Sequence, residues 1–209
     1  MTTGATHSAG IFTIGHSAHE VAQFTDLLAR HRIGAVADVR SVPYSRRHPQ
    51  FNREELKGSL KACGVAYVYL GKELGARSND PSCYENGRIQ FRKVAKATLF
   101  RSGIERILDG SQRMNIALMC AEKDPLECHR TILIARELVG LGKEVNHILS
   151  NGELETHHAA IDRLCRQLGI EEDLLRPPED LENDAYSAQE ERIAYASKEQ
   201  EQESKGAQE

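Results

Sequence analysis

No stretch of the chain approaches the roughly 18 consecutive apolar residues that a membrane-spanning helix needs. The start of the sequence has no basic segment followed by an apolar one, so we see no secretory signal. The five cysteines are an odd number at wide spacings, which argues against a disulfide framework and fits a reducing compartment. These absences predict a cytoplasmic protein that has no membrane partner.

Familiar phosphate-binding loops are also missing. The sequence contains neither a glycine-rich Walker loop nor a Gly-x-Gly-x-x-Gly motif. A Cys-x5-Arg phosphate loop that began at Cys120 would need arginine where Leu126 stands, and one that began at Cys128 would need it at Ile134. A loop of the tyrosine-phosphatase type is therefore disfavoured.

Charge is unevenly distributed along the chain. The net charge is −4, but residues 176–209 hold ten acidic and four basic residues, which leaves 21 acidic and 23 basic residues elsewhere. We expect a flexible leader at 1–10, an α/β domain at 11–175 and an acidic tail at 176–209 that is disordered or at most loosely helical. The nearly neutral body gives only weak support for nucleic-acid binding.

Apolar runs typical of buried strands alternate with segments of helical periodicity. Strands are expected at 11–14, 35–39, 66–70, 116–120 and 145–149, with helices between them and a long polar loop at 71–90. This alternation predicts an α/β fold, in which a mostly parallel sheet carries helices on both faces within a single compact domain.

Local signals predict where the helices begin and end. Capping boxes are expected at Ser17 with Glu20, Asn52 with Glu55, and Asp124 with Glu127. Gly34 is expected to end the first helix. A helix over 91–108 is expected to break near Ser102-Gly103, and a further helix is expected over 154–168.

The sequence is organised around residues 116–130. An apolar strand ends near Cys120, and a helix is expected to begin at Asp124, with Pro125 in its first position, and to continue through 128–130. Two thiols, an imidazole and a guanidinium thus lie where a strand leads into a helix N-terminus. Such a place attracts anions and can lower the pKa of a thiol.

The carboxyl ends of parallel strands meet at one edge of the sheet, where open α/β sheets bind ligands. Three of the expected strands are followed there by polar or reactive side chains. These are His16 and Ser17; Asp38, Arg40, Ser45 and Arg46; and Cys120, Glu122, Cys128, His129 and Arg130. We therefore predict that the three groups form one site.

The arginines in these groups suit a small anionic ligand. Arg40, Arg46 and Arg130 are expected to hold a phosphate, sulfate or carboxylate. The alternative is that they pair with Asp38 or Glu122 and only fix the loops.

Cys120 is the better candidate for a nucleophile, because it ends a strand and faces the expected helix start. Cys128 is one turn into that helix and is the better candidate for a core residue, although either thiol can be a buried apolar side chain. His16 or Glu122 can move a proton, but a histidine at a strand end is often only hydrogen-bonded. Ser17 is more readily a helix cap than a nucleophile.

A zinc site could combine Cys120, Cys128 and His129, with His16 as a fourth ligand. The gap between the two cysteines is not that of a zinc finger, and adjacent side chains on a helix point to different faces. We therefore predict no metal ion and no other cofactor.

Three motifs together resemble the domain-of-unknown-function family numbered 488. They are Thr13-Ile-Gly-His-Ser17, Asp38-Val-Arg40 followed by Pro43 and Ser45-Arg46, and Met119-Cys-Ala-Glu122 followed by Cys128-His-Arg130. The resemblance covers roughly residues 11–150 and implies a compact α/β domain whose site includes these motifs and Tyr84. One departure is Ala76, where the family commonly has a second glycine after Leu74-Gly75.

The residues favour an enzyme, a hydrolase or group transferase, that acts on a small anionic, phosphate-bearing or nucleotide-like substrate. One alternative is a non-catalytic module that binds a nucleotide or a nucleic acid. A third option is a metal-dependent redox or regulatory protein. The sequence does not indicate an oligomeric state.

Overall fold

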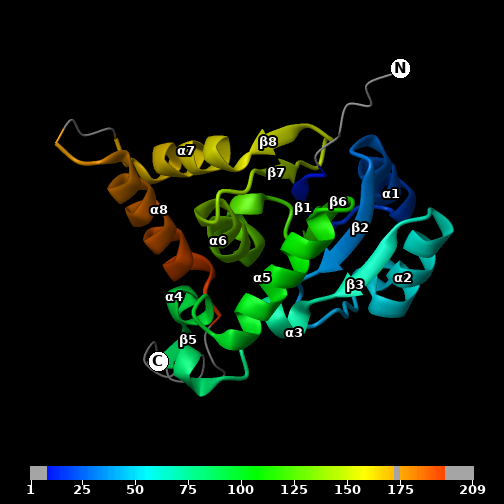
Figure 1. The fold of residues 1–209 in the computed structure, drawn as a ribbon, viewed down its shortest axis with the longest axis horizontal. Coiled ribbons are helices and arrows are strands. Elements are labelled where there is room, and N and C mark those ends of the chain that lie inside the picture. Colours follow the sequence, from blue (N-terminus) through cyan, green and yellow to red (C-terminus); the bar gives the residue numbers. More distant parts are fainter. Residues whose placement is uncertain (1–8, 172–174, 196–209) are drawn as a thin grey trace, which may run out of the picture.

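The computed structural model describes residues 9–171 and 175–195. Its centre is a six-stranded sheet in the order β3-β2-β6-β1-β7-β8 (Figure 1). The strands are β1 (Ile11–Gly15), β2 (Ile33–Asp38), β3 (Ala66–Tyr69), β6 (Asn115–Cys120), β7 (Val145–Ile148) and β8 (Leu154–Thr156). The first five are parallel to one another, and β8 is antiparallel to β7. The predicted mostly parallel sheet is confirmed.

Helices connect the strands, and a small hairpin lies apart from the main sheet. The helices are α1 (Val21–Arg30), α2 (Arg53–Ala62), α3 (Gly71–Leu74), α4 (Phe91–Val94), α5 (Thr98–Ser111), α6 (Arg136–Gly140), α7 (His157–Leu168) and α8 (Pro178–Ile193). The hairpin pairs β4 (Tyr84–Glu85) with β5 (Arg88–Ile89). No helix among the described residues combines the length and the apolar character needed to cross a bilayer.

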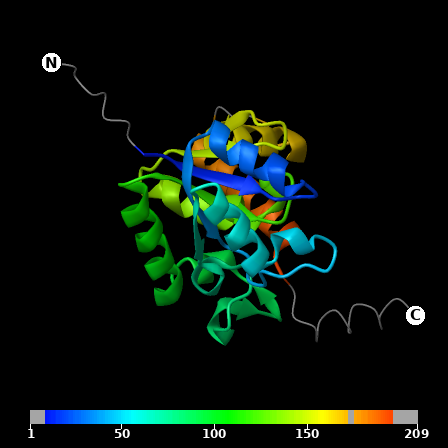
Figure 2. The ribbon, with the colours of Figure 1, turned by 90° about the vertical axis from the view of Figure 1, so that its right-hand side faces the viewer.

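The sheet has a hydrophobic core on each face. Side chains of a strand alternate between the two faces, so Ala117 and Met119 of β6 pack with the core under α1 and α2. Leu118 and Cys120 of the same strand pack with the core under α5, α6 and α7. Figures 1 and 2 show these two helical layers with the sheet between them. The predicted arrangement of helices on both faces is confirmed.

The register of the strands brings three chain segments to one edge of the sheet. Gly15 is paired with Cys120, and Asp38 is paired with Met119. The pairing continues into the loops, since the His16 amide donates to the Cys120 carbonyl at 2.9 Å. The amide of Val39 donates to the Met119 carbonyl at 3.1 Å. The segments that follow β1, β2 and β6 therefore lie side by side.

The predicted helix caps are wrong at three places. Helix α1 begins at Val21 without a side-chain cap, and Ser17 adopts a positive φ of 47° in the turn before it. The Asn52 side chain accepts from the Ser45 amide at 2.7 Å instead of capping its own helix. Gly34 lies inside β2, and the left-handed residue between α1 and β2 is Arg32.

Three other element predictions need correction. The helical segment after Phe91 breaks between α4 and α5, and Gly103 lies inside α5. A Cβ atom at Gly103 would lie 2.8 Å from Leu74, so this glycine allows α3 and α5 to pack closely. Residues 154–156 form strand β8 before α7. The long loop contains α3 and the β4–β5 hairpin.

Much of the predicted acidic tail is an ordered helix. Helix α8 buries Ala185, Tyr186 and Gln189. The Gln189 side-chain amide donates to the Leu126 carbonyl at 2.9 Å, which fastens α8 to the loop after β6. The prediction of a disordered tail is therefore wrong for residues 178–193, because the helix has an apolar face that the body covers. Residues 196–209 and most of the predicted leader lie outside the described residues.

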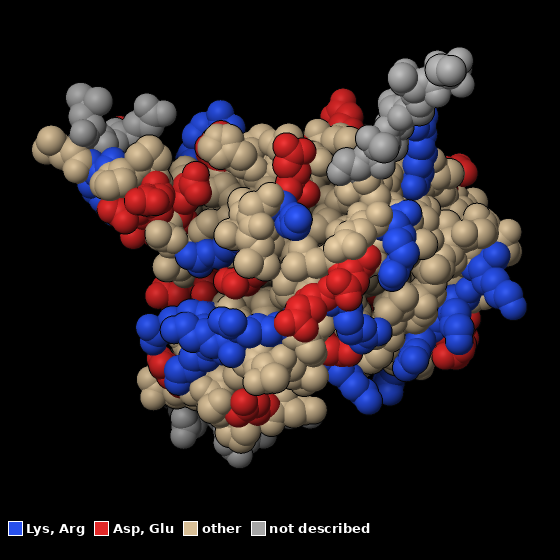
Figure 3. All heavy atoms as spheres, in the orientation of Figure 1, with Lys and Arg blue, Asp and Glu red and all other residues tan. Residues whose placement is uncertain are grey.

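Positive and negative side chains are interspersed on the face of the molecule drawn in Figure 3, with Lys and Arg gathered over the region of α4. This face therefore does not present one sign of charge over a broad area.

Candidate functional site

The segment after β6 does not form the continuous helix that its sequence predicts. Asp124 accepts from the Leu126 amide at 2.9 Å and begins a single 3-10 turn, Pro125–Glu127. Cys128 is then extended, with φ −143° and ψ 140°. A π-helical turn at Arg130–Ala135 follows and leads into α6. The extended Cys128 changes the direction of the backbone between the 3-10 turn and the π-helical turn. Turns of the π-helical type are frequent at functional sites.

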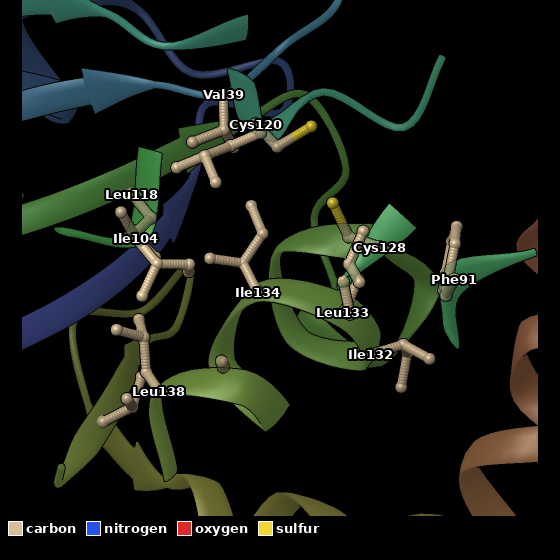
Figure 4. Packing of buried hydrophobic residues seen from close by; sticks show 14 of the residues in the cluster. Val39, Phe91, Ile104, Leu118, Cys120, Cys128, Ile132, Leu133, Ile134 and Leu138 are labelled. Carbon is tan, nitrogen blue, oxygen red and sulfur yellow. The ribbon is translucent and has the colours of Figure 1, made fainter. Parts of the chain in front are cut away.

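This turn brings two thiols and an imidazole together. His129 Nδ1 lies 3.6 Å from Cys128 Sγ and 3.8 Å from Cys120 Sγ. His129 Nε2 lies 3.1 Å from the Val39 carbonyl, which can only accept, so Nε2 carries a proton and Nδ1 faces the sulfur atoms. Figure 4 shows the sulfur atoms of Cys120 and Cys128 facing each other. The expectation that Cys128 and His129 point apart is wrong, because Cys128 is not helical.

The two thiols are not equivalent. Burial raises the pKa of Cys128, but the hydrogen bond with Cys120 and the positive charges of Arg130 and His129 lower it on balance below its ordinary range. The same hydrogen bond, together with burial, raises the pKa of Cys120. Cys128 is therefore the thiol that ionises first, whereas the sequence favoured Cys120.

Two neighbouring groups can hold the proton that Cys128 releases. Glu122 Oε2 lies 3.0 Å from Cys128 Sγ, and burial followed by the charge of Cys128 raises the pKa of Glu122. Burial lowers the pKa of His129, but Cys128 and Glu122 raise it on balance. A thiol, an imidazole and a carboxyl group, between which a proton can move, thus lie within a few ångströms of one another.

A second buried network surrounds Asp38 at the end of β2. Arg40 donates to Asp38 through Nε at 2.9 Å and through Nη2 at 2.7 Å, and it also donates to the Phe51 carbonyl at 2.8 Å. The Tyr67 hydroxyl donates to the same carboxylate at 2.7 Å. Most of the Arg40 donors therefore bind Asp38 and the Phe51 carbonyl, which fixes the loop after β2. This is the alternative that the sequence left open for the arginines.

His16 belongs to this network. Its Nδ1 lies 2.9 Å from the Ser17 carbonyl and must donate there, so Nε2 accepts from Arg40 Nη1 at 3.2 Å. Burial, opposed by the Ser17 carbonyl and assisted by Arg40 and His48, lowers the pKa of His16 to about 4. His16 is therefore neutral at pH 7 with both ring nitrogens occupied, which argues against the predicted proton transfer.

Arg130 supports the loop after β6 from beneath. It is only 1% exposed, and its Nη1 donates to the Glu122 carbonyl at 2.9 Å. Gly15 permits this close approach, because a Cβ atom there would collide with the same carbonyl. The guanidinium does not reach out to a ligand as predicted. Its positive charge instead lowers the pKa of Cys128.

Two adjacent hollows open at this edge of the sheet. The first, of about 280 Å³, is lined by Cys120, Cys128 and His129 together with Arg77 and Tyr195. The second, of about 530 Å³, is lined by His16, Ser17, Ser45, Tyr44, Arg47 and His48. Arg40, Val42, Ala121 and Glu122 line both hollows. Ten of the twelve predicted site residues thus lie in or directly beneath one composite site.

Two predicted residues lie outside this composite site. Arg46 is exposed on the loop beside the hollows. Tyr84 donates from its hydroxyl to the Ser78 carbonyl at 2.8 Å and is partly buried in the β4–β5 hairpin.

Several residues of the site were missed. Arg47 and His48 directly follow the predicted Ser45 and Arg46, but only the structure shows that these positions face the hollow. The Arg77 guanidinium lies over the Tyr195 ring, 4.4 Å from its centroid. Tyr195 follows α8, so no signal in the sequence could have placed it beside the thiols.

A family model described as Domain of unknown function DUF488 matches residues 20–136. The matched range contains Asp38 and Arg40 as well as the segment from Cys120 to Arg130, but it begins after His16. No curated protein and no solved structure matches the chain. Because the family model covers more than half of the 209 residues, the chain belongs to the family Domain of unknown function DUF488.

Proposed function

We propose that the protein is a hydrolase or group transferase that acts on a small anionic substrate, phosphate-bearing or nucleotide-like, with Cys128 as its nucleophile. The observation that carries this proposal is the placement of Cys128 Sγ 3.6 Å from His129 Nδ1, at the wall of a hollow that Arg40 and Arg77 also line. A nucleophile beside a base that a third group orients is the usual arrangement for covalent catalysis. Here the Val39 carbonyl orients His129.

In the reaction, Cys128 Sγ attacks the electrophilic phosphorus or carbon atom of the substrate. The bond from sulfur to that atom forms, the bond to the leaving group breaks, and protonated His129 gives its proton to the leaving group. Water or a second acceptor then attacks the thioester-like intermediate and regenerates the thiolate, while His129 takes up the proton. Glu122 is the reserve proton carrier, because its carboxyl group touches Cys128.

The anionic part of the substrate would contact cations at the rim of the two hollows. Arg47 and Arg77 are exposed and line one hollow each. Arg40 offers less, because its guanidinium is engaged with Asp38 and the Phe51 carbonyl. Arg47 and Arg77 are thus better anion contacts than the arginines that the sequence favoured.

One observation favours the alternative, a non-catalytic module that binds a nucleotide or a nucleic acid. Cys120 is 4% exposed and Cys128 is 2% exposed, so a substrate reaches the sulfur atoms only along the hollow. The same hollows and the same cations could hold a nucleotide without any reaction. The nearly neutral charge of residues 1–175, with 21 acidic and 23 basic residues, gives no support to a long nucleic acid as the ligand.

Thiol labelling separates these alternatives. The full chain, kept in a chelator, is treated with iodoacetamide in the presence and absence of inorganic phosphate, and each cysteine is followed by peptide mapping. Exposed Cys63 is the reference for an accessible thiol, and buried Cys83 is the reference for an inaccessible one. We expect Cys128 to be labelled well before Cys83 and phosphate to protect it. Labelling of Cys128 only together with Cys83 would contradict a reactive thiolate.

Turnover is then measured with a panel of phosphate esters and nucleotides. Cys128→Ser should lower the rate by about 10³-fold or more, because the covalent step is lost. Cys63→Ser is the matched control and should leave the rate unchanged. Tight nucleotide binding that is sensitive to Arg77→Ala, without any turnover across the panel, would favour the binding module.

A further inference from the structure

We propose that Cys120, Cys128 and His129 form a binding site for a thiophilic divalent cation, for which zinc is the best fit. The ligand atoms of these three residues all lie within 4.8 Å of one another, and all three residues are buried. This inference goes beyond the proposed function and does not depend on it, since a cation could bind whether or not any substrate reacts.

The distances match the geometry of a tetrahedral zinc site. Zinc binds sulfur at about 2.3 Å and nitrogen at about 2.0 Å, so tetrahedral angles place sulfur and nitrogen ligands about 3.5 Å apart. His129 Nδ1 lies 3.6 Å from one sulfur atom and 3.8 Å from the other. The three ligands would therefore need little rearrangement to coordinate the ion.

The surroundings orient the imidazole for coordination. Histidine ligands of metals usually donate their other ring N–H to a carbonyl or carboxylate, which fixes the ring. The Val39 carbonyl receives Nε2–H of His129 at 3.1 Å and so directs the lone pair of Nδ1 toward the two sulfur atoms. Val39 follows β2, whereas Cys120 ends β6 and the other two ligands follow that strand, so the pairing of β2 with β6 holds the parts of this site together.

The fourth position of the cation would face the hollow. All three ligands line the hollow that contains Arg40 and Arg77, so that side of the ion is open to water or to an anion. Two cysteines, one histidine and an open position make up a coordination set that catalytic zinc sites use. Glu122 lies 3.0 Å from Cys128 Sγ and would adjoin the ion.

Coordination would change the chemistry of the site. Each thiol that still carries its proton releases it when it binds the cation, and two thiolates then balance the two positive charges. Cys128 cannot be a free nucleophile in that state. The cation and an electrophilic substrate would therefore compete for Cys128, so cation binding would protect the thiolate.

The test uses the full chain, stripped with a chelator and then titrated with Co²⁺ and Zn²⁺. We expect one equivalent of Co²⁺ to bind and to give the absorption of a tetrahedral cobalt–thiolate centre, which one equivalent of Zn²⁺ abolishes. Cys120→Ser and His129→Gln should each weaken binding by more than about tenfold, because each removes a ligand. Cys63→Ser and Cys165→Ser are the matched controls and should bind as the unchanged chain does.

Labelling of the unchanged chain provides a second measurement if a ligand variant fails to fold. One equivalent of Zn²⁺ should protect both Cys120 and Cys128 from iodoacetamide while Cys63 is still labelled. Substoichiometric binding, an octahedral cobalt spectrum or unaltered binding in both ligand variants would overturn the proposal. Failure of the site leaves the Cys128 reactivity in chelator intact, so the cation site and the proposed function fail independently.

Discussion

At the scale of single residues, the character of Cys128 depends on neighbours that are far away in the sequence or hidden from the solvent. The side chain of Cys120 in β6 and the buried positive charge of Arg130 both lower the pKa of Cys128. Cys120 belongs to the same core yet has its pKa raised. The identity of a cysteine therefore says little about its reactivity until its hydrogen bonds and nearby charges are known.

The second buried network depends on Asp38. The substitution Asp38→Asn should lower the free energy of unfolding by about 3–5 kcal/mol, because it leaves the buried Arg40 without its counter-charge. Urea denaturation at pH 7 measures the loss. Glu54→Gln, which removes an exposed carboxylate that lies near Arg53, is the control and should change the free energy by less than about 1 kcal/mol. An equal effect of the two substitutions would contradict this role for Asp38.

At the scale of elements, a chain of buried polar side chains joins β1, β7, α7 and α8. His147 Nδ1 lies 2.8 Å from the Thr13 hydroxyl, and its Nε2 lies 3.2 Å from His157 Nδ1. His157 Nε2 lies 2.6 Å from the Tyr186 hydroxyl. This series of hydrogen bonds gives the Tyr186 hydroxyl of α8 a polar partner within an otherwise apolar contact. It therefore fixes the position in which α8 packs against the body.

The buried histidines of this hydrogen-bonded series predict that acid destabilises the fold. Burial, followed by the charge of His158, lowers the pKa of His157 from 6.5 to about 4. The unfolded chain therefore binds the extra proton first, and stability present above pH 6.5 is lost as the pH falls toward 4. The shift corresponds to about 3 kcal/mol for this one histidine.

Urea denaturation at several pH values between 7.5 and 4.5 measures the effect. His157→Gln should make the decline of the unfolding free energy shallower, although the variant is less stable at every pH. Gln167→Ala is the control, because that exposed side chain on the same helix has no ionisable group. Identical pH slopes for the two variants would show that His157 is not the titrating group.

At the scale of the whole molecule, α8 covers the body beside the candidate site. It buries Tyr186 and Gln189, it contacts the turn before Cys128, and the residues after it line the hollow that contains the thiols. One of its acidic side chains also faces the body, since Glu190 accepts from the Phe91 amide at 2.6 Å. The helix is therefore both a part of the core and a wall of the site.

Removal of residues 176–209 should destabilise the chain, because it exposes the apolar surface that α8 covers. We expect the free energy of unfolding to fall by about 2 kcal/mol or more and iodoacetamide to label Cys128 faster. Removal of residues 198–209 alone is the control and should leave both quantities unchanged. Unchanged stability after the longer truncation would mean that α8 does not contribute to the fold in solution.

Much of the fold is predictable from local patterns. The apolar runs of β1, β2, β3, β6 and β7 and the helical periodicity between them establish the parallel sheet, whose strand ends must share an edge. Helix starts and breaks are harder, since Ser17 and Asn52 use their side chains or backbone in contacts other than caps. Strand β8 was missed because three residues are too few to show a period.

The sequence by itself determined the α/β class and the residue types of the site. It also determined that the segments after β1, β2 and β6 meet at one edge of the sheet, because this follows from periodicity and strand direction. The tertiary structure alone decided that Cys128 is extended, that His129 faces both thiols, and that Arg40 and Arg130 are engaged in buried contacts. It also decided that α8 packs against the body. The physical reason is that hydrogen-bond partners, burial and pKa depend on neighbours that distant segments supply, and no local pattern specifies those neighbours.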